Sequence, residues 1–497
     1  MDKRYKRLVG NSIIFAIGNF GSKLMQFIMI PIYSYALSTY EFGKVDLLTN
    51  IVYLLAPIVS FDLFDGAFRF ALDKFEDKRY LDGFLSDNTP VGLLANKGYN
   101  DIIVIRLSND AAGDKSLQKY VDLNLIMFII GSICSIFVTG YPIMYTVILL
   151  IITIFFSLVS NFARAIGFVK HFAIAGIINT FTMGVANIIL LLVVKLGIEG
   201  YLVSFCVGQF IGILYLFIAT DIPNYLSVRE YSLETLKKLL KYSIPLIPNG
   251  LAWWLNSTSD RVFVLGILGP SYNGIYAMAS KIPSAISTIL SVFFQSWQIS
   301  VVEEYDKKDS MKFINTVYDT LSSLLFCAAV LLVAVIKPVF NLILSANYYN
   351  GWKLIPILLL SVIYTNIASF LGTMYTANKK TVGILTTTVY GAIINVILTV
   401  VFLNMIGLNG AAVANAVSFF VVSLLRYKYM KKLGKIRINF RKAIYLHVMF
   451  IVSCLSVYIL KSNITIFMVG ILLIVAQIIL DSNLKLLLKG VIMRCTK

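Results

Sequence analysis

Long apolar segments recur along the whole chain, and their length constrains the fold more than any other feature. About 20 apolar residues in a helix cross a bilayer core, and the 497 residues contain fourteen segments of roughly that length. Backbone polar groups inside lipid must bond within their own segment, which favours helices. The sequence therefore predicts an all-α integral membrane protein with about 14 transmembrane helices. The predicted cores are 11–37, 45–68, 121–139, 143–163, 171–194, 198–219, 243–268, 274–298, 314–336, 352–374, 383–404, 410–427, 443–460 and 464–480.

Composition supports the membrane class. Hydrophobic residues make up 58% of the chain and charged residues 14%, whereas soluble domains carry about 25% charged residues. The five cysteines are scattered and form no C-x-x-C pair, so we expect neither a disulfide framework nor a zinc site. His171 and His447 lie near predicted span ends, and we interpret them as interfacial residues rather than metal ligands.

Lysine and arginine indicate the orientation of the spans. With a cytoplasmic N-terminus, 35 of the 43 basic residues fall in cytoplasmic segments and five in outer loops. This asymmetry is typical of proteins that keep positive loops inside. It predicts a multi-pass protein of the cytoplasmic membrane with both termini in the cytoplasm. The net charge of +18 then faces membrane lipids, and we expect no nucleic-acid partner.

Two pairs of similar segments indicate an internal repeat. "YEFGKVDLLTNI" resembles "SYNGIYAMASKI", which matches Gly43 with Gly274. "KLGIEGYLVSF" resembles "MIGLNGAAVAN", which matches Gly200 with Gly410. The first pair opens the second span of each half and the second pair opens the sixth. We therefore predict two six-helix lobes in parallel repeat plus two C-terminal helices, an arrangement that secondary transporters use.

The repeat sets the expected domain boundaries. Residues 1–219 form an N-terminal lobe of helices 1 to 6, with a soluble cytoplasmic insert at about 80–120. Residues 220–242 form a cytoplasmic linker and 243–428 a C-terminal lobe of helices 7 to 12. Residues 429–497 provide a basic cytoplasmic loop, helices 13 and 14, and a cytoplasmic tail.

Polar residues inside predicted spans mark the candidate site, because intramembrane charges usually face a cavity or a partner. Three spans each carry a cation beside polar residues, which predicts a hydrated cavity that attracts an anion. The candidate substrate-binding residues are Lys23, Arg261, Lys281, Asn19, Gln26, Asn256 and Gln295. Candidates for a coupling or gate role are Asp260, Asp62, Asp65 and Arg69. Alternatively, Asp260 pairs locally with Arg261, and Asp62 with Arg69 forms an interfacial salt bridge.

Motifs of other chemistry are missing from the sequence. No G-x-x-x-x-G-K-[ST] and no H-E-x-x-H occurs, so we expect no ATP hydrolysis, metal, cofactor or catalytic residue. The longest predicted outer loop, 337–351, contains no acid or histidine, which disfavours a membrane glycosyltransferase or polymerase. The remaining interpretation is transport driven by a gradient, a potential or downstream use of the substrate.

Three stretches resemble bacterial polysaccharide-biosynthesis flippases of the multidrug/oligosaccharidyl-lipid/polysaccharide exporter superfamily. They are "NSIIFAIGNFGSKLMQFIMIPIYSYALSTYEFGKVDLL", "NFARAIGFVKHFAIAGIINT" and "LNSTSDRVFVLGILGPSYNGIYAMASKIPSAISTILSVFFQSWQIS". The likeness covers residues 1–79 and 121–497.

This resemblance implies two six-helix bundles around a cationic cavity and transfer of a polyprenyl-diphosphate-linked oligosaccharide to the outer leaflet. It also implies polymerases or glycosyltransferases as partners. A murein-precursor flippase and a cation-coupled multidrug exporter are the alternatives within the superfamily.

The insert resembles a different family. "YLDGFLSDNTPVGLLANKGYNDIIVIRLSND", residues 80–110, is similar to the stretch around the catalytic aspartate of patatin-like phospholipases. Asp82 and Gly83 match that family's D-G-[GA] motif, and Phe84 departs from it. The chain has no G-x-S-x-G nucleophile motif, and an aspartate without a nucleophile cannot hydrolyse an ester. A membrane-bound lipid hydrolase is therefore a remote alternative.

Overall fold

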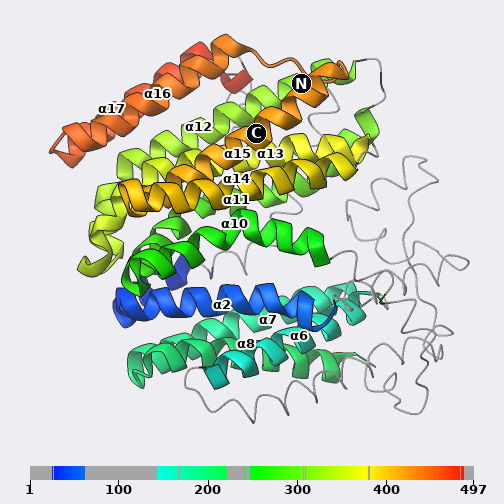
Figure 1. The fold of residues 1–497 in the computed structure, drawn as a ribbon, viewed down its shortest axis with the longest axis vertical. Helices are drawn as coiled ribbons and strands as arrows, with labels where there is room; N and C mark the ends of the chain where they lie inside the picture. The colour runs from blue at the N-terminus through cyan, green and yellow to red at the C-terminus, as the bar shows by residue number, and fades with distance from the viewer. Residues whose placement is uncertain are drawn as a thin grey trace, which may run out of the picture. The chain divides into compact units, whose positions relative to one another are not determined.

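The described part of the protein is built from helices. The computed structural model describes residues 25, 27–61, 143–165, 168–220, 240, 247–305, 307, 309–378, 381–481 and 483–485, and no strand occurs within these ranges (Figure 1). A short helix spans Phe27–Ala36. The other elements are α2 (Thr39–Val59), α6 (Ile143–Ala165), α7 (Val169–Asn187), η3 (Ile188–Val193), α8 (Gly197–Ala219), α10 (Ile247–Leu268), α11 (Pro270–Glu304), α12 (Ser310–Ile343), η7 (Ala346–Leu354), α13 (Ile355–Ala377), α14 (Thr381–Ile406), α15 (Leu408–Lys432), α16 (Phe440–Ile459) and α17 (Asn463–Leu480).

Eleven spans among the described residues are long and apolar enough to cross a membrane. Each lies on a segment that the hydropathy pattern predicts as a span, from α2 to α17. Many of their large apolar side chains are exposed, including Val382, Ile464 and Leu472. Exposed apolar side chains of this kind can face the hydrocarbon core of a bilayer, where they need no protein partner. Helix α10, which carries Asp260 and Arg261, is not among the eleven.

Two boundaries differ from the predicted ones. Helix α2 ends at Val59 rather than near residue 68, because Phe61 adopts a positive φ of 51° that no α-helix continues. The predicted outer loop 337–351 is largely ordered, since α12 runs to Ile343 and η7 follows as a 3₁₀ helix. The described helix α2 thus ends before its predicted core does, whereas α12 and η7 extend beyond theirs.

The chain divides into two compact units. The C-terminal unit contains the first turn of α2 up to Gly43, α10 from Leu255, and helices α11 to α17. The N-terminal unit contains the helix Phe27–Ala36, the rest of α2, α6, α7, η3, α8 and the beginning of α10 up to Trp254. The boundary in the second half of the chain thus lies inside α10.

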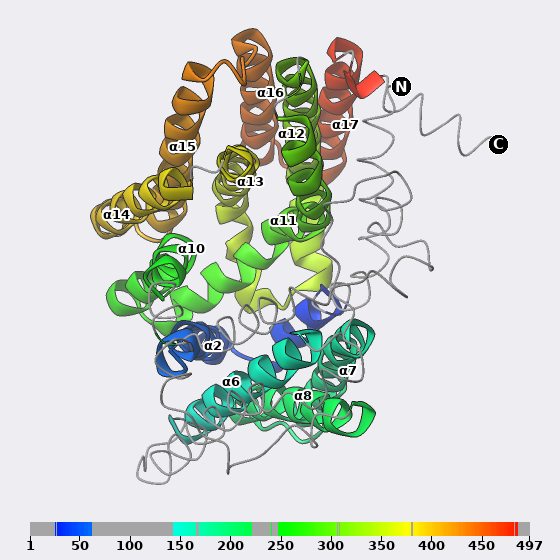
Figure 2. The same ribbon diagram turned by 90° about the vertical axis from the view of Figure 1, so that its right-hand side faces the viewer.

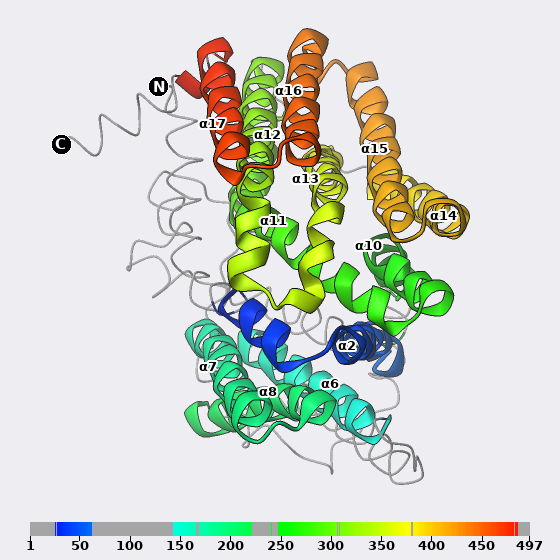
Figure 3. The same cartoon turned by 90° about the vertical axis from the view of Figure 1, so that its left-hand side faces the viewer.

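In the C-terminal unit, α16 and α17 form an antiparallel hairpin that packs against α12 (Figures 2 and 3). An aromatic stack fills the centre of this unit. The Trp297 ring lies 4.5 Å from the Phe370 ring and is fully buried. Because Trp297 comes from α11 and Phe370 from α13, this stack joins two helices that are far apart in the sequence.

The first turns of α2 and α11 meet through a reciprocal pair of glycines. A Cβ atom on Gly43 would lie 1.9 Å from the Pro270 carbonyl oxygen, and one on Gly274 would lie 1.8 Å from the Thr39 carbonyl oxygen. Asn273 donates a 2.7 Å hydrogen bond to the Gly43 carbonyl. Each glycine is the fifth residue of its helix, so the two matched segments occupy equivalent helix positions and contact each other.

In the N-terminal unit, α6, α7 and α8 pack together around Leu158, Ala175 and Leu202. Helix α7 ends in the π-helical segment η3, and Asn187 just before it donates a 3.3 Å hydrogen bond to the Tyr33 hydroxyl. This contact ties the helix Phe27–Ala36 to the end of α7.

Candidate functional site

Asp260 is the centre of a buried polar network in the C-terminal unit. Its side chain is 2% exposed. The carboxylate accepts a 2.5 Å hydrogen bond from the Tyr276 hydroxyl and a 3.2 Å bond from the Asn415 amide. Asn415 in turn accepts from the Ser361 hydroxyl at 2.9 Å. Helices α11 and α15 therefore bond the Asp260 carboxylate of α10 directly, and α13 joins the network through Asn415.

Arg261 has different surroundings from Asp260. Its guanidinium donates a 3.0 Å hydrogen bond to the Ser280 hydroxyl of α11, and the residue is partly exposed. The backbone N–H of Arg261 donates to the Asp260 carboxylate at 2.9 Å. The guanidinium lies beside α11, and its charge also acts on the Asp260 carboxyl. The local pairing of Asp260 with Arg261 therefore stays a prediction.

Lys281 is partly exposed and directly follows Ser280, the partner of Arg261. Within α11, the Ser284 hydroxyl donates to the Lys281 carbonyl at 2.7 Å, and the Ser291 hydroxyl bonds the helix backbone in the same way. Arg261 and Lys281 both belong to the C-terminal unit. The two serine hydroxyls bond to their own helix, which is a usual arrangement in apolar surroundings.

The remaining predicted site residues lie outside what the structure describes. These are Lys23, Asn19, Gln26, Asp62, Asp65 and Arg69, together with the side chains of Asn256 and Gln295. Their roles stay predictions.

A second set of buried polar side chains connects α10 to α14. The Ser259 and Thr399 hydroxyls each lie 3.4 Å from the Asn395 side-chain oxygen. The Asn395 amide nitrogen is buried without a hydrogen-bond partner, although such groups are nearly always paired in proteins. Asn395 and Asn415 were not predicted as site residues. Polar side chains within apolar segments are a sequence signal that would have found them.

Arg426 is a buried cation that the sequence reading assigned to a cytoplasmic segment. It is 4% exposed. It donates hydrogen bonds to Thr387 and Thr388 of α14 at 3.0 Å each and to the Ala368 carbonyl of α13 at 2.7 Å. Gly372 leaves room for the guanidinium, because a Cβ there would lie 2.8 Å from it. Arg426 thus connects three helices of the C-terminal unit.

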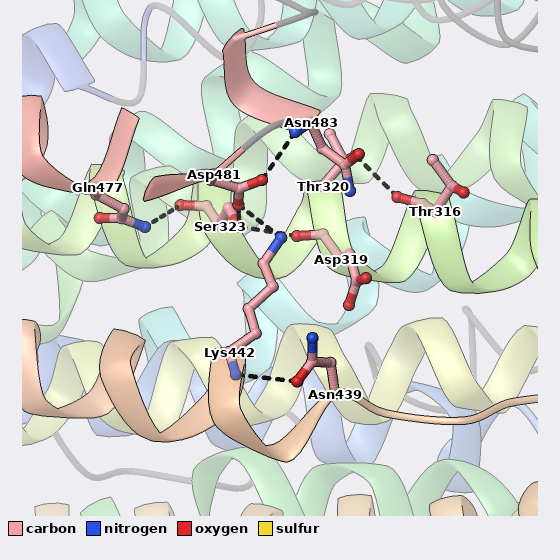
Figure 4. Close-up of polar contacts among 9 residues, drawn as sticks. All are labelled: Thr316, Asp319, Thr320, Ser323, Asn439, Lys442, Gln477, Asp481 and Asn483. Carbon is pink, nitrogen blue, oxygen red and sulfur yellow. Dashed lines mark hydrogen bonds and ion pairs between the residues drawn. The ribbon is translucent and has the colours of Figure 1, made fainter. Parts of the chain in front are cut away.

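A cluster of polar side chains connects the α16–α17 hairpin to α12 (Figure 4). Lys442 forms a 2.5 Å ion pair with Asp481, and Ser323 donates a hydrogen bond to the same carboxylate. Gln477 donates to the Ser323 carbonyl at 3.0 Å. Burial raises the pKa of Asp481, but the bonds from Lys442 and Ser323 outweigh it and hold this pKa below its usual range.

Each histidine contacts a tyrosine of another helix. His171 contacts the Tyr215 hydroxyl at 3.0 Å and His447 the Tyr364 hydroxyl at 2.9 Å. No group of three potential metal ligands occurs among the described residues. Both histidines therefore act as contacts between helices.

Solved membrane transporters share this fold. The chain is similar to the lipid II flippase MurJ in an inward closed conformation, with 16% identity, a TM-score of 0.63, and 94% of this chain and 98% of that chain covered. It is also similar to a multidrug resistance transporter of the MATE family, inward-facing, with 13% identity, a TM-score of 0.61, and coverage of 82% and 94%. A third is a MOP-superfamily transporter from Pyrococcus furiosus, with 14% identity, a TM-score of 0.53, and coverage of 87% and 96%.

The fold defines a class of architecture. The chain is an all-α, multi-pass membrane protein with the fold of these solved transporters. Residues 123–353 match the family described as "Polysaccharide biosynthesis protein". No curated protein sequence matches the chain.

The patatin-like stretch, residues 80–110, lies outside the family match and outside the described residues. The comparisons lend it no support.

Proposed function

We propose that the protein moves a polyprenyl-diphosphate-linked oligosaccharide from the inner to the outer leaflet of the cytoplasmic membrane by alternating access. The observation that carries this proposal is the match of residues 123–353 to polysaccharide biosynthesis proteins, on a chain with the fold of flippases and exporters. Cell-surface polysaccharides are assembled from lipid-linked units, so the family description favours such a cargo over a free drug molecule.

In this proposal, cations hold the diphosphate. Arg261 of α10 bonds Ser280 of α11, and Lys281 is the next residue of α11. The sequence pattern adds Lys23 from the first span. Arginine and lysine bind phosphate oxygens through charge-assisted hydrogen bonds. Asn19, Gln26, Asn256 and Gln295 would contact sugar or water.

Asp260 would couple transport to an ion gradient. A carboxylate shielded from water and held by a phenol and an amide can exchange a proton or bind a monovalent cation as its surroundings rearrange. The same observation favours the second candidate function, cation-coupled export of drugs.

The test uses proteoliposomes and a fluorescent polyprenyl-diphosphate oligosaccharide whose appearance in the opposite leaflet is measured. Lys23→Ala, Arg261→Ala and Lys281→Ala should each slow translocation at least tenfold, because each removes a diphosphate contact. The matched control is Lys461→Ala, which changes an exposed lysine between α16 and α17. Normal translocation in all three site variants would refute the cationic site.

Asp260→Asn separates coupling from binding. We expect it to abolish the response of translocation to an imposed proton or sodium gradient while cargo binding persists. Efflux of cationic dyes by the wild-type protein, with no movement of the lipid-linked cargo, would instead favour the drug exporter.

A further inference from the structure

Exposed cations gather where α15 ends and α16 begins. Five of them define the α15–α16 basic surface: Lys428, Lys431 and Lys432 in the last turns of α15, Arg437 in the connection, and Arg441 in the first turn of α16. The sequence contains no acidic residue between Asp319 and Asp481. Of these two acids, Asp481 is already paired with Lys442. No described carboxylate forms an ion pair with any of the five cations.

Three contacts hold this surface in place on the C-terminal unit. Lys435 donates a 2.6 Å hydrogen bond to the Tyr305 carbonyl and lies 4.2 Å from the centre of the Tyr305 ring. Ile436 is 1% exposed and anchors the segment in the core. The Arg437 backbone N–H donates to the Asn315 side chain at 2.9 Å. Because residues 435–437 are each held by the C-terminal unit, the connection between α15 and α16 has a fixed path.

Apolar side chains lie among the exposed cations. Leu433 is 40% exposed and Phe440 is 61% exposed. The segment directly follows the apolar helix α15 and precedes α16, which places it at the depth of the membrane–water interface. Surfaces that bind anionic membranes typically combine two kinds of side chain. Cations contact the lipid phosphates, and neighbouring apolar groups enter the boundary of the acyl chains. A soluble acidic partner would give no reason for the exposed Phe440.

We propose that the α15–α16 basic surface binds the phosphate headgroups of anionic phospholipids. This role is independent of the transported cargo, so it can hold or fail separately from the proposed function. Bound lipid would neutralise the repulsion among the five cations and thereby stabilise the ends of α15 and α16.

The test compares two variants that lose the same charge. One is Lys431→Gln/Lys432→Gln/Arg437→Gln, on the basic surface. The control is Lys195→Gln/Lys353→Gln/Lys461→Gln, three exposed lysines that the charge asymmetry predicts to lie in outer loops. Each full-length protein is purified and titrated with phosphatidylglycerol or phosphatidylcholine. Native mass spectrometry counts retained lipids, and thermal melting reports stability.

We expect wild type and control to retain phosphatidylglycerol preferentially and to melt at a higher temperature in its presence. The basic-surface variant should retain at least threefold less phosphatidylglycerol and lose most of that rise, with phosphatidylcholine binding unchanged. High salt should weaken the wild-type preference toward that of the variant. Equal losses in both variants would show a general charge effect and overturn the proposal. Tight binding of soluble poly-glutamate at this surface, with no response to phosphatidylglycerol, would overturn it in favour of an acidic protein partner.

Discussion

At the scale of single residues, the decisive fact is that Asp260 and Arg261 are neighbours in sequence with different partners in space. Consecutive residues of an α-helix point about 100° apart, so Asp260 enters the core of the C-terminal unit and Arg261 lies beside α11. The apolar pattern identified both as costly intramembrane charges. It could not reveal that Tyr276 and Asn415 complete the Asp260 network, because those partners come from other helices.

The Lys442–Asp481 ion pair gives a prediction at the same scale. Both side chains are largely buried, at 11% and 2% exposed. Removing one partner of a buried ion pair leaves an uncompensated charge and costs about 3 kcal/mol. We therefore expect Asp481→Asn to lower the melting temperature at pH 7, whereas Lys485→Gln, an exposed lysine nearby, should not.

The pH dependence of this effect has a defined sign. The pKa of Asp481 lies below its usual range in the folded protein. The stability it contributes is therefore complete above the unfolded pKa of about 3.9 and is lost as the pH falls through the folded value. The difference in melting temperature between wild type and Asp481→Asn should stay constant from pH 7 to pH 5 and shrink below pH 4. A difference that grows on acidification would contradict the ion-pair account.

At the scale of helices, the glycine contact between α2 and α11 links sequence and structure most directly. The repeat matched Gly43 with Gly274 by their place in two similar segments. The structure adds that these two glycines lie against each other's helix backbone. Similarity between two segments shows where each helix begins, but it does not show which other helix packs against it. Only the packed unit reveals why both positions must lack a side chain.

Gly274→Ala tests this contact. Alanine favours a helix over glycine by about 0.5–1 kcal/mol, but its Cβ would lie 1.8 Å from the Thr39 carbonyl oxygen. Because backbone atoms cannot rotate away, we expect a net destabilisation of about 1–3 kcal/mol, seen as a lower melting temperature in detergent. The control is Gly266→Ala in α10, where no described atom beyond the local helix backbone lies within 4 Å of the added Cβ, and it should be neutral or slightly stabilising. Equal melting temperatures for the two variants would mean that α2 and α11 can move apart without a loss of stability.

At the scale of the whole molecule, the prediction concerns the insert. The enlarged connection at about 80–120 lies outside both the family match and the described residues. In the predicted repeat, the insert enlarges the connection between spans 2 and 3 of the first half. The equivalent connection between spans 8 and 9 in the second half is short. We expect deletion of 81–118 to leave translocation of the lipid-linked cargo largely intact. The measurement is transport by a variant whose membrane insertion is first shown to be normal, and abolished transport in that variant would assign the insert an essential role.

The sequence alone determined the fold class, an all-α membrane protein, and the positions of most helices. The cost of an unpaired backbone in lipid forces each long apolar segment to satisfy its hydrogen bonds internally. Each helix is therefore encoded locally, and α6, α8, α13 and α17 lie where hydropathy predicts them. Tertiary structure alone decided which side chains meet. The Asp260 network, the helix connections of Arg426 and the Lys442–Asp481 pair each join residues distant in the chain. Such contacts depend on how helices pack, and packing is set by the shapes of several helices together and by no single segment.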